Sequence, residues 1–384
     1  MVITVLNQWF EIYKERSLFH RYIAQGHVAP LLKNLKTSFK IESIGQSVLG
    51  VSIDVILVGT GNKKIFMWSQ MHGNESTTTK AVFDILNAFE NCEDHQIKQI
   101  LSSCTIAIIP MLNPDGAKAY TRSNANEIDL NRDAQELSQP ESKVLMKFYK
   151  SFKPDFCFNL HGQRTIFSAG KANKPATVSF LAPAQDESCA VTNNRRRAME
   201  IIVQMNKVLQ KQIPHQVGVY DDSFNINCVG DTFQRDNVPT VLFEAGHYAH
   251  DYPREVTRRY IFQSLLTAMN YIATTEITGN YYNDYFEIPQ NEKLFYDIII
   301  RNSYTAGGNF DIAVMFQEKL IEKTIEFVPI VEKIEDLNGF YGHKEINANN
   351  NAVLKANLEP LKVGDEIDFV LINSKKFSLI LKNI

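Results

Sequence analysis

The sequence has few cysteines and no long apolar run. Its five cysteines are odd in number, widely scattered and never paired as CxxC, which argues against a disulfide framework and against a thiolate metal site. No stretch reaches the roughly 18 to 20 consecutive apolar residues of a membrane span. The start of the chain also lacks the basic region and the unbroken apolar run of a signal peptide. We therefore expect a reduced, cytoplasmic protein without a membrane partner, and a processed or leaderless secreted form stays open as the alternative.

An excess of either charge is also missing. The chain has 40 Lys and Arg residues against 43 Asp and Glu residues, a formal net charge of -3, so its charge gives no reason to expect nucleic acid as a partner. With 384 residues, of which 44% are hydrophobic, the chain is long enough for a sizeable core and for two or three domains. The sequence does not indicate an oligomeric state.

Residues 40–270 alternate between short apolar runs and longer amphipathic patterns. The runs predict strands at residues 52–58, 64–70, 105–112, 155–160, 177–183 and 240–246, and the amphipathic patterns predict helices at residues 76–92, 194–213 and 254–275. Strands that alternate with helices predict an α/β fold with a largely parallel sheet covered on both faces. Such sheets place their chemistry at the carboxyl ends of the strands.

The pattern changes near residue 284. Residues 1–283 are predicted to form the catalytic domain, with residues 1–40 as a helical N-terminal extension. Residues 284–384 contain short alternating strands broken by Gly and Asn turn signals, which predict a small β domain. This domain has no chemistry of its own in the sequence, so a role in folding, in dimerisation or as a substrate-recognition wall stays open.

Two histidines and a glutamate follow predicted strands. His72 and Glu75 lie in "HGNE" directly after one strand, and Asn74 or Ser76 is expected to cap the next helix. An HxxE pair alone is more often a solvated turn. His161, however, also ends an apolar run and is also followed by glycine. Two histidines and one carboxylate form the ligand set of a catalytic zinc site, so we predict bound Zn2+.

Zinc-dependent hydrolysis also needs a general base and groups that bind the substrate. Glu244 in "LFEAG" ends a strongly apolar strand pattern, where a charge is costly unless it is paired or belongs to a site, so we interpret it as the base. Arg122, Asn131 and Arg132 follow the tight turn "NPDG". An arginine fork suits a carboxylate, and a second arginine can stabilise an oxyanion. A single arginine is more often part of a surface salt bridge.

Six motifs occur in order over residues 72–246: "HGNE", "NPDG", "TRS", "DLNRD", "NLHG" and "LFEAG". Together they resemble the zinc metallocarboxypeptidases of the carboxypeptidase A type. The resemblance implies an α/β fold with a mixed, mostly parallel central sheet of about eight strands flanked by helices. It also implies that zinc is held by His72, Glu75 and His161.

The same resemblance implies roles for the other polar residues. Glu244 would be the general base that activates water and passes the proton to the leaving amine. Arg122 would polarise the scissile carbonyl and stabilise the oxyanion. Asn131 and Arg132 would hold the free C-terminal carboxylate of a peptide.

Some features of the family have no clear match. Gapless counting back from the base places the family's mobile tyrosine near Asp222, and the nearest tyrosine is Tyr220. The pocket for the substrate side chain should be lined from "NINCVGDTF", by Val229, Gly230 or Asp231. The stretch between the zinc ligands is short and lacks the disulfides of the digestive enzymes, which indicates a non-digestive, bacterial-like branch.

Two other functions fit part of the pattern. Deacylases resembling aspartoacylase and succinylglutamate desuccinylase share "HGNE"-like and "DLNR"-like elements and cleave N-acyl amino acids, but "NPDG" followed by "TRS" favours a peptidase. A non-catalytic module that binds C-terminal tails would be expected to lack a metal ligand or the base, and both are present here. A cell-wall peptide is one candidate substrate, with Arg164 as the reader of its acidic group.

Overall fold

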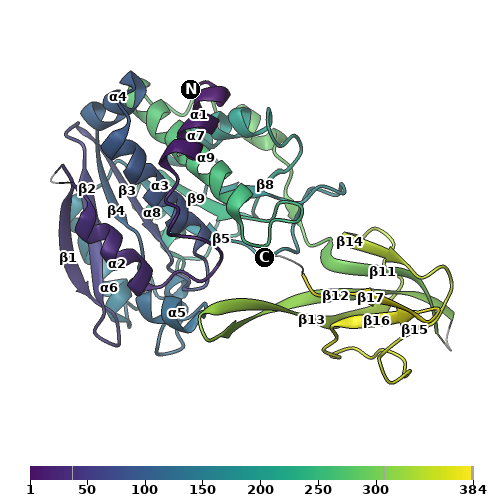
Figure 1. Cartoon of the computed structure of the whole chain (residues 1–384). Coiled ribbons are helices and arrows are strands. Elements are labelled where there is room, and N and C mark those ends of the chain that lie inside the picture. The colour runs from purple at the N-terminus through teal and green to yellow at the C-terminus, as the bar shows by residue number, and fades with distance from the viewer. Residues whose placement is uncertain (37, 306–307, 382–384) are drawn as a thin grey trace.

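The computed structural model describes residues 1–36, 38–305 and 308–381 (Figure 1). Its main lobe contains an eight-stranded sheet in the order β1-β2-β4-β3-β5-β9-β7-β8. The strands are β1 (Lys40–Gln46), β2 (Ser52–Val58), β3 (Lys63–Ser69), β4 (Cys104–Ile109), β5 (Phe156–Gly162), β7 (Val178–Leu181), β8 (Val217–Val219) and β9 (Thr240–Ala245). The predicted α/β fold with a central sheet of this size is confirmed.

The sheet is mixed, with a parallel centre. β4, β3, β5 and β9 run parallel to one another. β2 pairs antiparallel with both β1 and β4, and β7 pairs antiparallel with β9. All six predicted strands of this lobe are present. The strand predicted at residues 105–112 already ends at Ile109, because Pro110 has no N–H to donate to a neighbouring strand.

Helices cover both faces of the sheet (Figure 1). They are α1 (Ile3–Tyr13), α2 (Gln25–Asn34), α3 (Thr77–Asn91), α4 (His95–Ser103), α5 (Pro114–Ala119), α6 (Pro140–Phe152), α7 (Asn193–Leu209), α8 (Val229–Arg235) and α9 (Glu255–Thr274), with a short 3-10 turn η1 (Leu130–Arg132). Successive strand residues point to opposite faces, so Met67 joins the core under α1, α3, α7 and α9, while Trp68 joins the core under α6 and α8.

The turn between β3 and α3 holds His72 and Glu75. The predicted side-chain cap of α3 is wrong, because Ser76 occupies the N-cap position but caps no backbone N–H. The Ser76 hydroxyl instead donates to the backbone oxygen of Arg21 at 2.5 Å, and Oδ1 of Asn74 is buried without a partner among the described residues. A tertiary contact with the N-terminal segment has therefore replaced the local cap.

The chain after residue 282 forms η2 and further sheets (Figure 1). A four-stranded sheet has the order β13-β12-β11-β14, a three-stranded sheet has the order β15-β16-β17, and β10 pairs with β6 of the main lobe. These elements are β6 (Ser168–Ala169), η2 (Asn283–Glu287), β10 (Asn291–Glu292), β11 (Phe295–Thr305), β12 (Gly308–Ile321), β13 (Thr324–Glu335), β14 (Tyr341–Asn347), β15 (Val353–Leu354), β16 (Phe369–Ile372) and β17 (Lys375–Ser378). The domain boundary near residue 284 stays a prediction.

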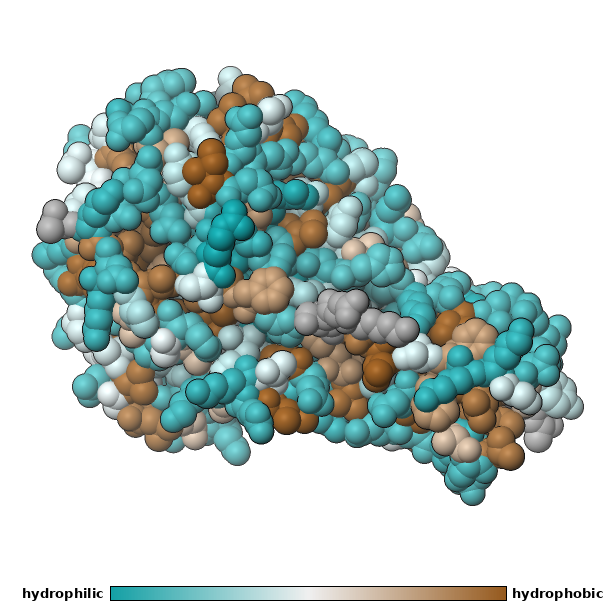
Figure 2. All heavy atoms as spheres, in the orientation of Figure 1, coloured by the Kyte–Doolittle hydropathy of each residue, from teal (hydrophilic) through white to brown (hydrophobic). Residues whose placement is uncertain are grey.

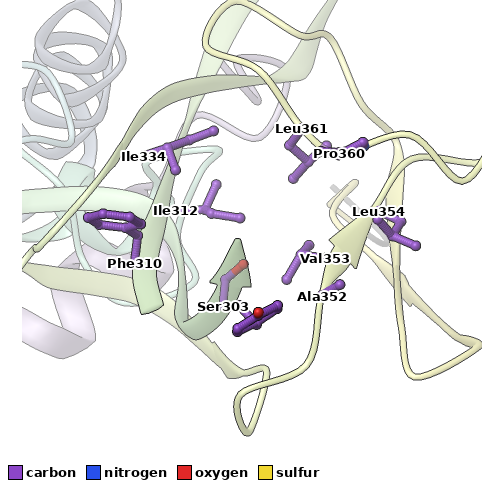
Figure 3. A pocket seen from close by; sticks show the side chains of 10 residues that line it. Ser303, Phe310, Ile312, Ile334, Ala352, Val353, Leu354, Pro360 and Leu361 are labelled. Atoms are coloured by element: carbon purple, nitrogen blue, oxygen red, sulfur yellow. The ribbon is translucent and has the colours of Figure 1, made fainter. Parts of the chain in front are cut away.

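The two C-terminal sheets enclose their own apolar core. A cavity of about 660 Å³ opens beside it and is lined mainly by apolar side chains, with Ser303 as a polar exception (Figure 3). The face of the molecule in Figure 2 is mostly hydrophilic, and apolar side chains gather around these sheets and their junction with the main lobe. Within the described ranges, no helix has the length and apolarity needed to cross a bilayer.

A buried ion pair joins two helices to the N-terminal segment. Arg258 on α9 and Asp84 on α3 are both fully buried, with two nitrogen-to-oxygen distances of 2.6 and 2.7 Å between them. Arg258 also donates to the backbone oxygens of Glu15, at 2.8 Å, and Leu18, at 2.6 Å. The pair therefore fixes the segment that leads to Arg21.

Replacing Asp84 with alanine should lower the free energy of unfolding by about 3 to 5 kcal/mol, because Arg258 would stay buried without its main counter-charge. Urea denaturation measures this loss. The control is Glu187→Ala, which removes an exposed carboxylate that has no hydrogen bond or ion pair in the described part of the chain and should cost less than about 0.5 kcal/mol. A loss for Asp84→Ala no larger than that of the control would contradict the assignment.

Candidate active site

The predicted site residues lie at one edge of the central sheet. β3, β5 and β9 are parallel neighbours, so their carboxyl ends meet there. His72 and Glu75 follow β3, His161 lies near the end of β5, and Glu244 lies near the end of β9. His161 and Glu244 are direct partners in the β5–β9 register. Strand order therefore brings together residues that are far apart in sequence.

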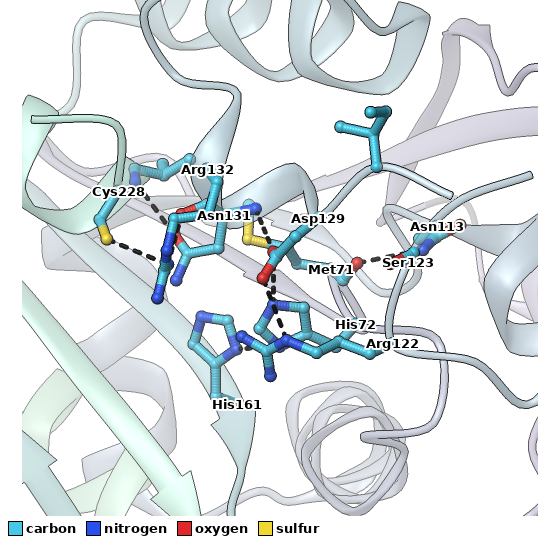
Figure 4. A network of polar contacts seen from close by, with 12 residues as sticks. Met71, His72, Asn113, Arg122, Ser123, Asp129, Asn131, Arg132, His161 and Cys228 are labelled. Carbon is cyan, nitrogen blue, oxygen red and sulfur yellow. Dashed lines mark hydrogen bonds and ion pairs between the residues drawn. The ribbon is translucent and has the colours of Figure 1, made fainter. Parts of the chain in front are cut away.

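Three candidate ligand atoms, from His72, Glu75 and His161, converge on one point, and Figure 4 shows the two histidine rings facing one another. The Nδ1 atoms of His72 and His161 lie 3.1 Å apart, and the two carboxylate oxygens of Glu75 lie 2.8 and 3.0 Å from them. Ligand atoms of the three residues all lie within 4.8 Å of one another. Two imidazole nitrogens and a carboxylate are a catalytic zinc ligand set. The donor chemistry and the convergence both fit one zinc ion.

Asp129 orients one of these imidazoles. Its Oδ1 lies 3.0 Å from Nε2 of His72. With the hydrogen on Nε2, the lone pair of Nδ1 points toward Glu75 and His161, as a metal ligand requires. The other oxygen of Asp129 accepts from Nε of Arg122 at 3.0 Å (Figure 4). Asp129 is not among the site residues predicted from the sequence, although its place in "DLNRD" was an available signal.

The two glutamates of the site are placed in opposite electrostatic environments. Burial alone would raise the pKa of Glu75, but His72 and His161 lower it well below its usual range, so Glu75 stays ionised. Burial, followed by the charge of Glu75, raises the pKa of Glu244 well above its usual value. Oε2 of Glu244 is also buried without a partner among the described residues. Carboxylates whose pKa values are pushed apart are typical of an acid–base site.

One cleft of about 590 Å³ contains all of the predicted site residues. Its lining includes His72, Glu75, Arg122, Asn131, Arg132, His161, Tyr220 and Glu244. Arg122 is 48% exposed, and its Nη1 lies 3.4 Å from the Oε1 of Glu75. The side chain of Arg122 therefore lies beside the metal ligands with part of its surface open to the cleft. The roles of the individual residues stay predictions.

Asn131 and Arg132 lie on another wall, next to the start of α8. Oδ1 of Asn131 accepts from the backbone nitrogen of Val229 at 3.0 Å, which fixes the amide. Nη1 of Arg132 donates to the backbone oxygen of Asn131 at 2.7 Å and lies 3.1 Å from Sγ of Cys228 (Figure 4). Arg132 is exposed and forms no ion pair with a carboxylate in the described part of the chain.

Tyr220 follows β8, and its ring meets the ring of Phe167 edge-on within the cleft, with 5.3 Å between the ring centroids.

The three residues predicted to line the pocket for the substrate side chain, Val229, Gly230 and Asp231, lie elsewhere among the described residues. Val229 packs in the core under α8, and a side chain at Gly230 would press on Pro183 at 3.2 Å. Asp231 is buried, which raises its pKa to about 6. None of the three is among the described residues that line this cleft.

The cleft also contains residues that our sequence analysis did not predict. Arg21 comes from the N-terminal segment, and Phe316 and Glu318 come from β12 of the C-terminal sheets. They lie outside all six motifs, and no spacing pattern connects them to the other site residues. Only the tertiary fold brings them to the cleft.

A family model described as zinc carboxypeptidase matches residues 30–228, slightly more than half of the chain. Carboxypeptidase M of Mus musculus is 28% identical over 181 residues, which cover 40% of this chain and 41% of that protein. The chain spans less than half the length of the curated relatives it matches. The family match includes the three candidate metal ligands and ends before Glu244.

Solved structures share the fold of the main lobe. Carboxypeptidase A from Helicoverpa armigera matches with a TM-score of 0.53 at 15% sequence identity, and the match covers 71% of this chain and 80% of that protein's chain. A metallo-carboxypeptidase from Pseudomonas aeruginosa, solved with (2-guanidinoethylmercapto)succinic acid, has a TM-score of 0.51 at 17% identity and covers 64% and 68%. At these identities the likeness shows the fold alone.

We expect the purified chain to bind one zinc ion. Asp129→Ala should weaken zinc binding about 10- to 100-fold, because the His72 ring loses the hydrogen bond that fixes its orientation. Competition with a chromogenic chelator measures the affinity. Asp129→Asn keeps an oxygen acceptor for Nε2 and should lose less. Equal affinity in wild type and Asp129→Ala, or full binding by His161→Ala, would contradict the assigned ligand set.

Proposed function

The chain belongs to the zinc carboxypeptidase family, and from this premise we propose that it is a metallocarboxypeptidase that releases the C-terminal residue of a peptide. The observation that carries the proposal is the buried, unpartnered Oε2 of Glu244 in the cleft that also holds His72, Glu75 and His161. A buried polar atom without a partner is costly. It is expected where water or substrate supplies the missing contact.

The proposed reaction uses the two differently tuned glutamates. When bound, zinc supplies Lewis-acid activation of a water molecule and of a carbonyl oxygen. Glu244 accepts the proton of the attacking water and then passes it to the nitrogen of the leaving amine. Its raised pKa suits the intermediate stage, in which the carboxyl group holds the proton. Arg122 stabilises the negative charge that develops on the carbonyl oxygen.

Asn131 and Arg132 bind the terminal carboxylate in this proposal. Nη1 of the exposed guanidinium of Arg132 donates to the backbone oxygen of Asn131, but the described residues offer this guanidinium no carboxylate, so Nε and Nη2 are left to donate to a ligand. The hydrogen bond from Val229 to Oδ1 of Asn131 leaves the amide N–H groups of Asn131 to donate. Recognition of a free carboxylate beside the scissile bond limits cleavage to the end of a peptide.

Glu244→Gln should keep zinc but lower kcat about 10²- to 10⁴-fold, the usual contribution of a general base. We would offer zinc-loaded wild type and variant a mixed pool of peptides and N-acyl amino acids and identify the products by mass spectrometry. The wild type should release C-terminal residues.

Three results would contradict this proposal. Cleavage of N-acetylaspartate or succinylglutamate without cleavage of peptides would identify a deacylase. Stoichiometric peptide binding without turnover would identify a binding module. Equal turnover by wild type and Glu244→Gln would remove the assigned base.

Arg132→Gln should lower kcat/KM for a free-acid peptide about 10- to 150-fold, because a charge-assisted hydrogen bond is worth about 1.5 to 3 kcal/mol. The same peptide with an amidated C-terminus should be a poor substrate for both proteins. Initial rates on the matched pair of peptides measure the difference. The control is Arg235→Gln, at the end of α8 and outside the cleft. An equal loss on both peptides would contradict carboxylate recognition by Arg132.

A further inference from the structure

The C-terminal sheets contribute part of the active-site cleft. Phe316 and Glu318 on β12 line the same cleft as the candidate metal ligands. Oε1 of Glu318 lies 3.0 Å from Nη2 of Arg21, and the hydroxyl of Tyr120 donates to its other oxygen. Figure 1 shows the β12–β13 hairpin reaching from the C-terminal sheets toward α5, which ends just before Tyr120. The cleft is therefore incomplete without this hairpin.

Packing fixes the hairpin against the main lobe. Tyr120 and Tyr252 of the main lobe form one apolar cluster with Ile325 and Phe327 of β13. The hydroxyl of Tyr252 lies 2.9 Å from Oδ1 of Asp297 on β11. The other oxygen of Asp297 accepts from the backbone nitrogen of Phe316 at 2.8 Å. The wall formed by Phe316 and Glu318 is therefore a built part of the site.

Positive side chains outnumber negative ones in the cleft. Its lining contains the arginines Arg21, Arg122, Arg132, Arg164 and Arg254 but only the carboxylates Glu75, Glu244 and Glu318. A zinc ion would offset Glu75 and add further positive charge. Every carboxypeptidase substrate brings one carboxylate, for which Arg132 is proposed. A peptide whose only negative charge is its terminal carboxylate would therefore leave part of the positive charge of the cleft without a counter-charge.

Four of the arginines already have partners or an assigned ligand, and the ion pair between Arg21 and Glu318 is one of these interactions. Arg122 is paired with Asp129, Arg132 is assigned to the terminal carboxylate, and Arg254 donates to the backbone oxygens of Ala245 and Gln163. Among the described residues, these interactions leave Arg164 without a partner and use only one of the three side-chain nitrogens of Arg21.

Arg21 and Arg164 have donors to spare. Arg21 is 9% exposed, and its Nε and Nη1 atoms have no partner in the described part of the chain, although its Nη2 is held by Glu318. Arg164 is exposed, follows directly on the β5 end that carries His161, and pairs with none of the described carboxylates. An arginine that lines a cleft with free donors is suited to a carboxylate ligand.

We propose that Arg164 and Arg21 bind a second carboxylate, so that the preferred substrate is a peptide with an acidic residue directly before the scissile bond. This inference rests on the proposed carboxypeptidase function. The proposed function assigns the terminal carboxylate to Arg132, beside α8, whereas the backbone of Arg21 contacts Ser76 at the start of α3 and its side chain contacts Glu318 of the hairpin. With the scissile bond at the metal ligands and the terminal carboxylate at Arg132, we infer that the preceding residue lies in the part of the cleft lined by Arg21 and Arg164. Glu318 is a positioning residue that holds Arg21.

The test compares acetyl-Ala-Glu-Xaa with acetyl-Ala-Gln-Xaa, in which Xaa is the terminal residue that the wild type releases fastest. Zinc-loaded full-length wild type should prefer the glutamate peptide about tenfold or more in kcat/KM, because glutamine has the same shape without the charge. The preference should fall as NaCl concentration rises, since salt screens exposed charges.

Arg164→Gln should lower the Glu-to-Gln ratio of kcat/KM by about threefold or more, because the variant loses more rate on the glutamate peptide than on the glutamine peptide. Arg21→Gln should act in the same way, and the exposed control Arg235→Gln should leave the ratio unchanged. If buried Arg21 does not tolerate substitution, Arg164→Gln and the salt dependence decide the matter.

Two failures are distinguishable. Cleavage of both peptides at equal rates by the wild type, or a ratio that Arg164→Gln leaves unchanged, would overturn the second carboxylate site and leave the carboxypeptidase proposal in place. Cleavage of neither peptide, nor of any peptide in the pool, would overturn both.

Discussion

The convergence of the His72 and His161 Nδ1 atoms, 3.1 Å apart with Glu75 beside both, is the constraint on which the site depends. Both histidines are 2% exposed, so their two nitrogen lone pairs are held close together with little contact with solvent. One cation at that point satisfies all three side chains. The arrangement requires β3 and β5 to be parallel neighbours, and the register of the next strand then places Glu244 directly opposite His161. Asp129 fixes the orientation of the His72 ring through its hydrogen bond with Nε2.

The two ends of the chain are joined to this centre by buried charges. Arg258 binds Asp84 and the backbone of residues 15 and 18, which holds the segment leading to Arg21. Arg21 in turn meets Glu318 of the C-terminal hairpin. Because each buried charge has a defined partner, the N-terminal segment and the hairpin reach the cleft in one arrangement. Substrate selection is therefore expected to depend on residues far from the motifs.

The central sheet and the metal ligands could be predicted because their signals are local. Apolar runs of strand length gave every strand of the parallel centre, and a polar residue after such a run marked His72, His161 and Glu244. The cap of α3 could not be predicted, because the Ser76 hydroxyl is taken by a backbone oxygen 55 residues earlier. Arg21 and Glu318 could not be predicted from the sequence either, because they are joined only by an ion pair between residues that are far apart in the chain.

A crystal structure of the zinc-loaded protein, with anomalous diffraction measured on both sides of the zinc absorption edge, tests the central claim most directly. The account predicts one zinc peak bound by Nδ1 of His72, Nδ1 of His161 and the carboxylate of Glu75, at about 2.0 to 2.2 Å, with a fourth position facing Glu244. A zinc peak elsewhere, a different set of ligands, or a fourth position closed by a protein side chain would contradict it.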